Sequence, residues 1–240
     1  MDNLKVCLLL SATIRPTSVP FLKRTSALDR ERDYVESVSK WIAHGLPIVF
    51  VENSGTTSEN VKSELAKISN TEYLTYVSQN SSLGKSHGEI EIIEYAFKNS
   101  RIIQESDLII KVTGRYYVEN LMNILSDVIR QNAFVMGWMK HNLEFADSRL
   151  MIARKDFYRE YFIPQGPKVS EIDGIYFEHI YARAIHSAMS FGLKWCFPIS
   201  PPIFDGFSGT EDLRYKNDIF RRLKRNIILS LTKTLLKINY

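Results

Sequence analysis

The first 130 residues alternate between short apolar runs of strand length and longer segments with a helical period. The apolar runs are residues 4–10, 47–51, 73–77 and 108–112. The segments with apolar residues at helical spacing are 29–44, about 58–68, 84–98 and about 117–129. This alternation predicts an α/β fold in which a mostly parallel sheet is flanked by helices on both faces.

The second half of the chain alternates less regularly. Strands are predicted at 150–153 and 194–198, and helices at 155–161 and 170–191, the second with Ser170 as its N-cap. Residues 200–209 are rich in Pro and Gly, which is typical of a loop near a functional site. With 45% hydrophobic and 24% charged residues, the chain has the composition of an ordinary globular protein.

The net charge of +4 is concentrated near the C-terminus. Residues 213–240 contain eight basic residues and one acid, a net charge of +7, so the other 212 residues carry −3. The main body therefore lacks the basic surface of a nucleic-acid-binding protein, and we expect no nucleic-acid partner.

The basic segment also has an apolar stripe at helical spacing. Its members are Ile219, Phe220, Leu223, Ile227, Leu231, Leu235 and Ile238. A basic amphipathic helix suits the interface of an anionic membrane, so residues 213–240 are predicted to dock there. The alternative is a helix packed on the body with a solvated basic face.

Two further features bear on the compartment. Cys7 and Cys196 lie in apolar stretches, which favours buried free thiols in a reducing compartment. The sequence shows no secretory signal and no run near the roughly 20 apolar residues of a membrane span. We expect a cytoplasmic protein, peripheral on the inner face of the cytoplasmic membrane.

Polar residues follow each of the four predicted strands in the first half. They include Ser11, Thr13 and Arg15, then Glu52 and Asn53, then residues 80–89, and finally Lys111 to Tyr116. Ligands of parallel sheets bind beyond the carboxyl ends of the strands. Gly84 and Gly88, at the start of a helix, would let a phosphate approach closely. These turns predict a nucleotide-sugar site; the alternative is a set of ordinary loops.

The same residues resemble a known family. The order of strand, Glu52-Asn53-Ser54-Gly55-Thr56 and helix resembles the nucleotide-binding half of GT-A glycosyltransferases, and residues 84–96 are similar to their central helix. Ile110-Lys-Val-Thr-Gly-Arg-Tyr116 resembles a version seen in bacterial capsule and lipopolysaccharide transferases. The resemblance implies a GT-A-like catalytic domain at 1–212, with a nucleotide-binding half at 1–130 and an acceptor half at 131–212.

The resemblance also implies which residues bind the donor. Arg15, Glu52, Asn53 and Lys85 would contact the nucleotide or its phosphates. His87 is a further candidate for a phosphate contact, although a lone histidine is more often structural.

The sequence departs from metal-dependent members of this family after the fourth strand. Where they carry Asp-x-Asp, this chain has Lys111-Val-Thr-Gly-Arg115 and no carboxylate ligand for a hard divalent ion. We hypothesise that Arg115, with Lys111 or Lys85, replaces the metal and stabilises the departing phosphate. We therefore expect neither a metal nor another cofactor. The alternative for Arg115 is a helix cap or a surface ion pair.

The second half offers two candidate bases for the acceptor hydroxyl. Asp173 and Glu178 lie near the start of the predicted helix 170–191, in a segment that resembles the acceptor-facing part of GT-A enzymes. The alternatives are helix-end electrostatics for Asp173 and a solvated helix face for Glu178.

These features together predict a transferase acting on a lipid-linked intermediate of lipopolysaccharide O-antigen or capsule. The alternatives are a sugar nucleotidyltransferase and a non-catalytic protein of a polysaccharide assembly complex. A nucleotidyltransferase usually has a Gly-rich basic loop after its first strand, and residues 11–16 contain no glycine.

Overall fold

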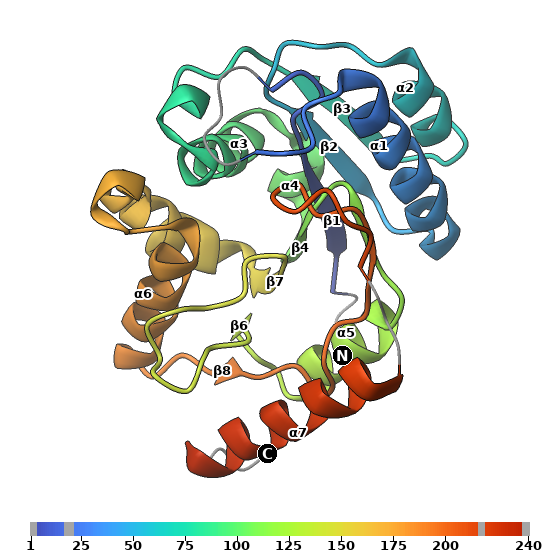
Figure 1. Ribbon diagram of the computed structural model, residues 1–240. Coiled ribbons are helices and arrows are strands. Elements are labelled where there is room, and N and C mark those ends of the chain that lie inside the picture. Colours follow the sequence, from blue (N-terminus) through green and yellow to red (C-terminus); the bar gives the residue numbers. More distant parts are fainter. Residues whose placement is uncertain (1–3, 17–21, 216–218, 237–240) are drawn as a thin grey trace.

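A seven-stranded sheet with the order β3-β2-β1-β4-β7-β6-β8 forms the centre of the protein (Figure 1). The computed structural model describes residues 4–16, 22–215 and 219–236. The strands are β1 (Val6–Ala12), β2 (Ile48–Glu52), β3 (Thr71–Thr75), β4 (Leu108–Thr113), β6 (Val135–Met136), β7 (Leu150–Arg154) and β8 (Trp195–Cys196). Strands β1 to β4 are parallel, whereas β7 runs antiparallel to both of its neighbours. The predicted mostly parallel α/β sheet is confirmed.

Helices cover both faces of this sheet, and the pleat of β1 decides which side chains meet them. The helices are α1 (Ala27–Trp41), α2 (Glu59–Leu65), α3 (Lys85–Asn99), α4 (Arg101–Glu105), α5 (Leu121–Arg130), α6 (Phe177–Ser190) and α7 (Ile219–Leu235). Because successive strand residues point to opposite faces, Cys7 and Leu9 join a core with α3, α4 and α6. Leu8 and Leu10 join the other core, with α1, α2 and α5.

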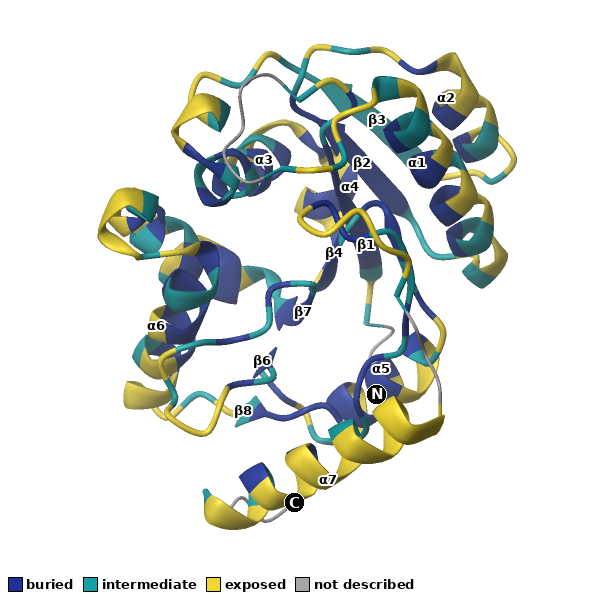
Figure 2. Ribbon diagram, viewed as in Figure 1, coloured by how far each residue is buried: buried dark blue, intermediate teal, exposed yellow. Residues whose placement is uncertain are grey.

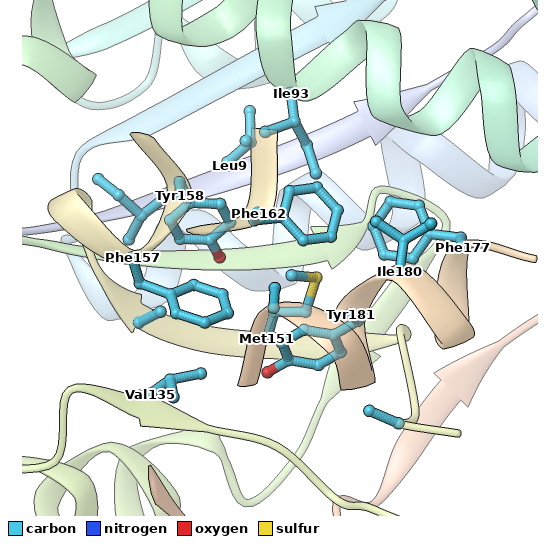
Figure 3. Packing of buried hydrophobic residues seen from close by; sticks show 14 of the residues in the cluster. Leu9, Ile93, Val135, Met151, Phe157, Tyr158, Phe162, Phe177, Ile180 and Tyr181 are labelled. Carbon is cyan, nitrogen blue, oxygen red and sulfur yellow. The ribbon is translucent and has the colours of Figure 1, made fainter. Parts of the chain in front are cut away.

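The core on the α6 side is unusually aromatic. Phe157, Tyr158 and Phe162, from the π-helical turn Phe157–Phe162, pack against Phe177 and Tyr181 of α6 (Figure 3). These rings are fully buried or nearly so, and burying a large side chain contributes about 1.5–3 kcal/mol. This packing fixes the first turn of α6 beside β4 and β7.

Three expectations about the elements are wrong. The helix expected from residue 117 begins at Leu121, because β5 (Tyr116–Val118) pairs with β9 (Phe204–Gly206) in a second small sheet. That pairing places a strand inside the predicted loop 200–209. The helix expected from Ser170 begins at Phe177, because the 3-10 turn Glu171–Asp173 ends at Gly174 with a φ of +74°. Strand β6 was not predicted at all.

The C-terminal helix α7 lies along the edge of the molecule near α5, and most of its surface is exposed (Figures 1 and 2). It contacts the body through Leu229 and Thr232, both buried. The apolar stripe from Ile219 to Leu235 faces outward: Phe220 is 83% and Leu235 73% exposed. The alternative of a helix packed on the body therefore agrees with the contacts of Leu229 and Thr232, whereas the stripe itself stays exposed. Ile238, also assigned to the stripe, lies outside them, as do Lys216, Asp218 and Lys237.

The cysteines and the lengths of the helices bear on two further expectations. Cys7 and Cys196 are buried free thiols, and burial raises the pKa of each to about 12. Across the described ranges, none of the helices has the length and apolar character needed to cross a bilayer.

Candidate active site

A pocket lies at the carboxyl ends of β1, β2 and β4, and we call it the strand-end pocket. Thr13 follows β1, Asn53 follows β2 and Thr113 ends β4, and all three line it. The Thr13 hydroxyl donates to Oδ1 of Asn53 at 2.6 Å, which ties the first two turns together. The sequence placed ligand-binding residues at this edge, and the structure brings these three to one pocket.

Three cationic side chains line the strand-end pocket: Arg30, Lys85 and Arg115. Arg115 is buried, donates from Nη1 to the Phe207 carbonyl at 2.8 Å, and has no hydrogen-bond partner for Nε among the described residues. Burial, reinforced by the neighbouring Arg115, lowers the pKa of Lys85. Burial is also the main cause that lowers the pKa of Arg30. An anion in the pocket would relieve this crowding of like charges.

The N-terminus of α3 is arranged differently from the expectation that it faces a phosphate. Glu171 accepts the backbone N–H of Ser86 at 2.6 Å, so a carboxylate already occupies part of this helix end. Gly84 has a φ of +141°, and a Cβ there would lie 2.3 Å from the Glu171 carboxylate. The glycine is therefore needed for this turn, and α3 presents the side chains of Lys85 and Glu89 to the pocket.

Three of the predicted donor-binding residues lie elsewhere. Glu52 is fully buried and its carboxylate accepts from the backbone N–H groups of Ile14 at 2.8 Å and Thr56 at 2.9 Å. It therefore orders the turns after β1 and β2 instead of facing a ligand. Arg15 is exposed and His87 half-buried, and neither lines the strand-end pocket.

Lys111, predicted to support the departing phosphate with Arg115, does not line the strand-end pocket. It is instead the centre of a buried hydrogen-bonded chain behind Glu89. It is fully buried and forms an ion pair with Glu89, a pocket-lining residue of α3. Its Nζ also donates to the Ser148 carbonyl at 3.2 Å, and the Ser148 hydroxyl donates to Glu178 at 2.7 Å. The chain Glu89–Lys111–Ser148–Glu178 connects the strand-end pocket to the first turn of α6.

Glu178, at the other end of this chain, lines a further pocket, which we call the second pocket. Its other walls include Trp138, Asp147 and Arg149. Burial raises the pKa of Glu178 above its ordinary value, against the opposing effect of the Ser148 hydrogen bond. Burial also favours the neutral form of Asp147, but the Arg149 guanidinium outweighs it and holds the pKa of Asp147 low.

The other candidate base, Asp173, is not in this arrangement. It is exposed on the turn before α6, where its carboxylate accepts from the Ser170 hydroxyl at 2.5 Å. Its expected place in the first turn of the helix is taken by Glu178.

Comparisons with known proteins decide the fold. No family model and no curated protein sequence matches the chain. The mannosyltransferase Ktr4p from S. cerevisiae in complex with GDP superposes with a TM-score of 0.52 at 10% identity, over 97% of this chain and 82% of that one. The WbbM bifunctional glycosyltransferase gives 0.51 at 10% identity, over 97% of this chain and 45% of that one. This chain has the GT-A fold.

The same fold occurs in a nucleotidyltransferase. The inositol-1-phosphate CTP transferase from T. maritima superposes with a TM-score of 0.50 at 11% identity, over 96% of each chain. Identities of 10–11% show the fold alone. The chemistry of this GT-A chain therefore depends on the residues of its own pockets.

At the turn after β4, the GT-A chain presents Thr113 and Arg115 to the strand-end pocket. Within the described part of the chain, no group of three or more His, Cys, Asp or Glu side chains is arranged to hold a metal ion. The residues that sequence reasoning missed are Arg30 from α1 and Asp147 and Arg149 from the segment before β7. For Asp147 and Arg149, the sequence signal was an acid and a base two residues apart, directly before a predicted strand.

Proposed function

We propose that this protein is a glycosyltransferase that moves a sugar from a nucleotide sugar to an acceptor hydroxyl. The observation that supports this most is the chain Glu89–Lys111–Ser148–Glu178, because it links a cationic pocket to a carboxylate with a raised pKa. The donor would lie in the strand-end pocket and the acceptor in the second pocket.

In the proposed donor site, protein cations stabilise the leaving group. Asn53 and Thr13 would contact the nucleoside, whereas Lys85, Arg115 and Arg30 would surround the diphosphate. A guanidinium and an ammonium fixed at the departing phosphate lower the barrier without a divalent ion. The three cations in one pocket, with a lowered pKa at Lys85, support this role.

In the proposed reaction, Glu178 is the general base. The acceptor oxygen forms a bond to the anomeric carbon, its proton passes to the Glu178 carboxylate, and the bond from that carbon to the phosphate oxygen breaks. The nucleoside diphosphate leaves with the bonding electrons. A base with a pKa raised by burial is better matched to this proton transfer than an exposed carboxylate, so Glu178 is preferred to Asp173.

We further propose that the acceptor is a lipid-linked intermediate of O-antigen or capsule, reached at the inner face of the cytoplasmic membrane. The support is the outward apolar stripe of α7, flanked by Arg221, Arg222 and Lys224. Each basic residue near an anionic surface contributes about 1 kcal/mol to membrane binding.

Replacing Leu223, Ile227 and Leu231 together by Ser is expected to weaken binding to phosphatidylglycerol vesicles by at least tenfold, because about 0.8 kcal/mol is lost for each buried CH₂. Vesicle co-sedimentation measures this effect. The matched control replaces the exposed Leu28, Leu83 and Ile172, which lie outside residues 213–240. Equal binding by both triple variants contradicts membrane docking through α7.

A thermal-shift panel of UDP, GDP, dTDP, CMP and ADP, each with EDTA or Mn²⁺, tests the donor site. A nucleotide that binds only the folded state raises the stability by RT ln(1 + [L]/Kd). We expect one nucleotide to raise the Tm in EDTA, and Lys85→Gln to reduce that shift. CTP is tested as a separate ligand, and a shift from it together with formation of pyrophosphate from CTP and a sugar phosphate would favour a nucleotidyltransferase. No shift from any of them would favour a non-catalytic assembly protein.

A further inference from the structure

A groove of arginines continues from the second pocket toward α7. Arg149 and Arg225 line the second pocket and also a neighbouring pocket between Asn120, the segment 200–204 and α7. Arg221 and Arg222 line that neighbouring pocket as well, and its described lining residues include no Asp or Glu. We call Arg149, Arg221, Arg222 and Arg225 the arginine groove.

Arg225 is the most informative member of the groove. Its guanidinium lies over the Trp138 ring, 5.2 Å from the centroid, which draws α7 onto the body. Its Nη2 is buried and has no hydrogen-bond partner among the described residues. Burial, followed by the repulsion of Arg149, lowers the pKa of Arg225. A buried donor without an acceptor is costly, and an anion in the groove would supply the acceptor.

Two other members are held in place by carboxylates: Asp147, which lines the second pocket, and Glu119, which lines neither pocket. Asp147 forms a hydrogen-bonded ion pair with Arg149, and Glu119 pairs with Arg222 at 3.3 Å. The wall of the neighbouring pocket formed by Asn120, Ser200 and Pro201 is also held by hydrogen bonds. Asn120 Nδ2 donates to the Ser200 hydroxyl and to the Pro201 carbonyl, each at 3.1 Å. These contacts hold the cations in position before any ligand arrives, which reduces the ordering needed on binding.

We propose that the arginine groove binds the diphosphate that joins the acceptor glycan to its lipid. This inference rests on the proposed glycosyl transfer, since it assigns the acceptor of the same site. The groove begins at the pocket that contains Glu178 and ends at α7. An acceptor sugar at Glu178 would thus place its diphosphate against the arginines and its lipid chain along the outward apolar stripe. Planar guanidinium groups bind phosphate oxygens in pairs, which suits a diphosphate better than a single carboxylate.

The experiment is calorimetric titration of inorganic pyrophosphate and of farnesyl diphosphate into the full chain. R222Q and R225Q are each expected to weaken binding of both probes by about tenfold or more, the size of a lost charge-assisted hydrogen bond. The matched control is K224Q, which removes the same charge from an exposed side chain of the same helix that lines neither pocket. Pyrophosphate can also bind in the strand-end pocket, where none of these substitutions lies. Binding at the arginine groove is therefore measured as the part that R222Q and R225Q lose and that K224Q keeps.

Four outcomes separate the possibilities. Loss in R222Q and R225Q, with tighter binding of farnesyl diphosphate than of pyrophosphate, supports the proposal. Equal affinity for the two probes overturns the claim that the lipid chain contributes to binding. An equal loss of affinity in K224Q shows a general effect of charge and overturns the claim that the arginine groove is the binding site. Arg222 is partly exposed at the rim, so R222Q keeps the test valid if R225Q does not fold. Failure of the chain to turn over any nucleotide sugar would instead overturn the proposed transfer, whatever the groove binds.

Discussion

Replacing Glu178 by Gln is expected to lower the rate of sugar transfer by about 10²- to 10⁴-fold, the usual contribution of a general base. Gln keeps the shape of the side chain and can still accept the Ser148 hydrogen bond, but it cannot take the acceptor proton. Nucleotide binding in the strand-end pocket should be unchanged, so the loss should appear in kcat. Release of nucleoside diphosphate in the presence of acceptor measures it.

Two comparisons make this prediction specific. Glu105→Gln, on an exposed side chain, should keep full turnover. Asp173→Asn should also stay active, because Asp173 is exposed and bonded only within its own turn. Full activity of Glu178→Gln, or a loss in Asp173→Asn as large as that in Glu178→Gln, would assign the base elsewhere.

The pH profile of the same reaction follows from the pKa of Glu178. The carboxylate must be ionised to accept a proton, so activity falls as the pH drops through its pKa. Burial raises that pKa above the ordinary 4.5, so the acid limb should lie above pH 4.5. Ser148→Ala removes a hydrogen bond that lowers the pKa, so the acid limb should move to still higher pH.

Replacing Glu89 and replacing Lys111 are expected to lower the stability by unequal amounts, although each substitution breaks the same ion pair. Glu89→Gln leaves the fully buried Lys111 ammonium without its carboxylate, which should lower the free energy of unfolding by about 3 kcal/mol. For a chain of this size that is a fall in Tm of about 6–12 °C. Lys111→Met should be milder, because Glu89 is partly exposed and keeps the hydroxyls of Ser11 and Thr113 nearby.

Thermal unfolding of the two variants tests this asymmetry. The matched control is Glu59→Gln, which breaks the exposed pair with Lys62 and should cost about 0–1 kcal/mol. Equal losses in Glu89→Gln and Lys111→Met, or a Tm unchanged in both, would show that the pair does not hold the sheet to α3 as described.

The first half of the fold was predictable because its signals are local. Buried parallel strands such as β1 and β4 appear as unbroken apolar runs, and Ser58, a residue type favoured at helix N-termini, caps α2. The convergence of Asn53, Lys85 and Arg115 followed from the rule that parallel strands end at one edge of the sheet.

The remaining features depend on contacts between distant residues. Strands β5 and β9 are three residues each and exist because they pair with one another across about 90 positions of sequence. Glu52 looked like a ligand contact, but its carboxylate is used by the backbone of its own turn and of residue 14. Arg225 could not be assigned to a site, because nothing local indicates that α7 turns it toward Trp138.

The most direct measurement of the central claim is release of the leaving nucleotide by the wild-type chain, in EDTA and in Mn²⁺. This nucleotide is a nucleoside diphosphate from UDP-, GDP- and dTDP-sugars and CMP from CMP-sugars. We predict that one donor is turned over in EDTA, because Lys85 and Arg115 would support the leaving phosphate. We also predict that Glu178→Gln slows its transfer to acceptor by about 10²- to 10⁴-fold. Turnover that disappears in EDTA and returns with Mn²⁺ would contradict the cation-supported mechanism, and no turnover of any donor would contradict the transferase itself.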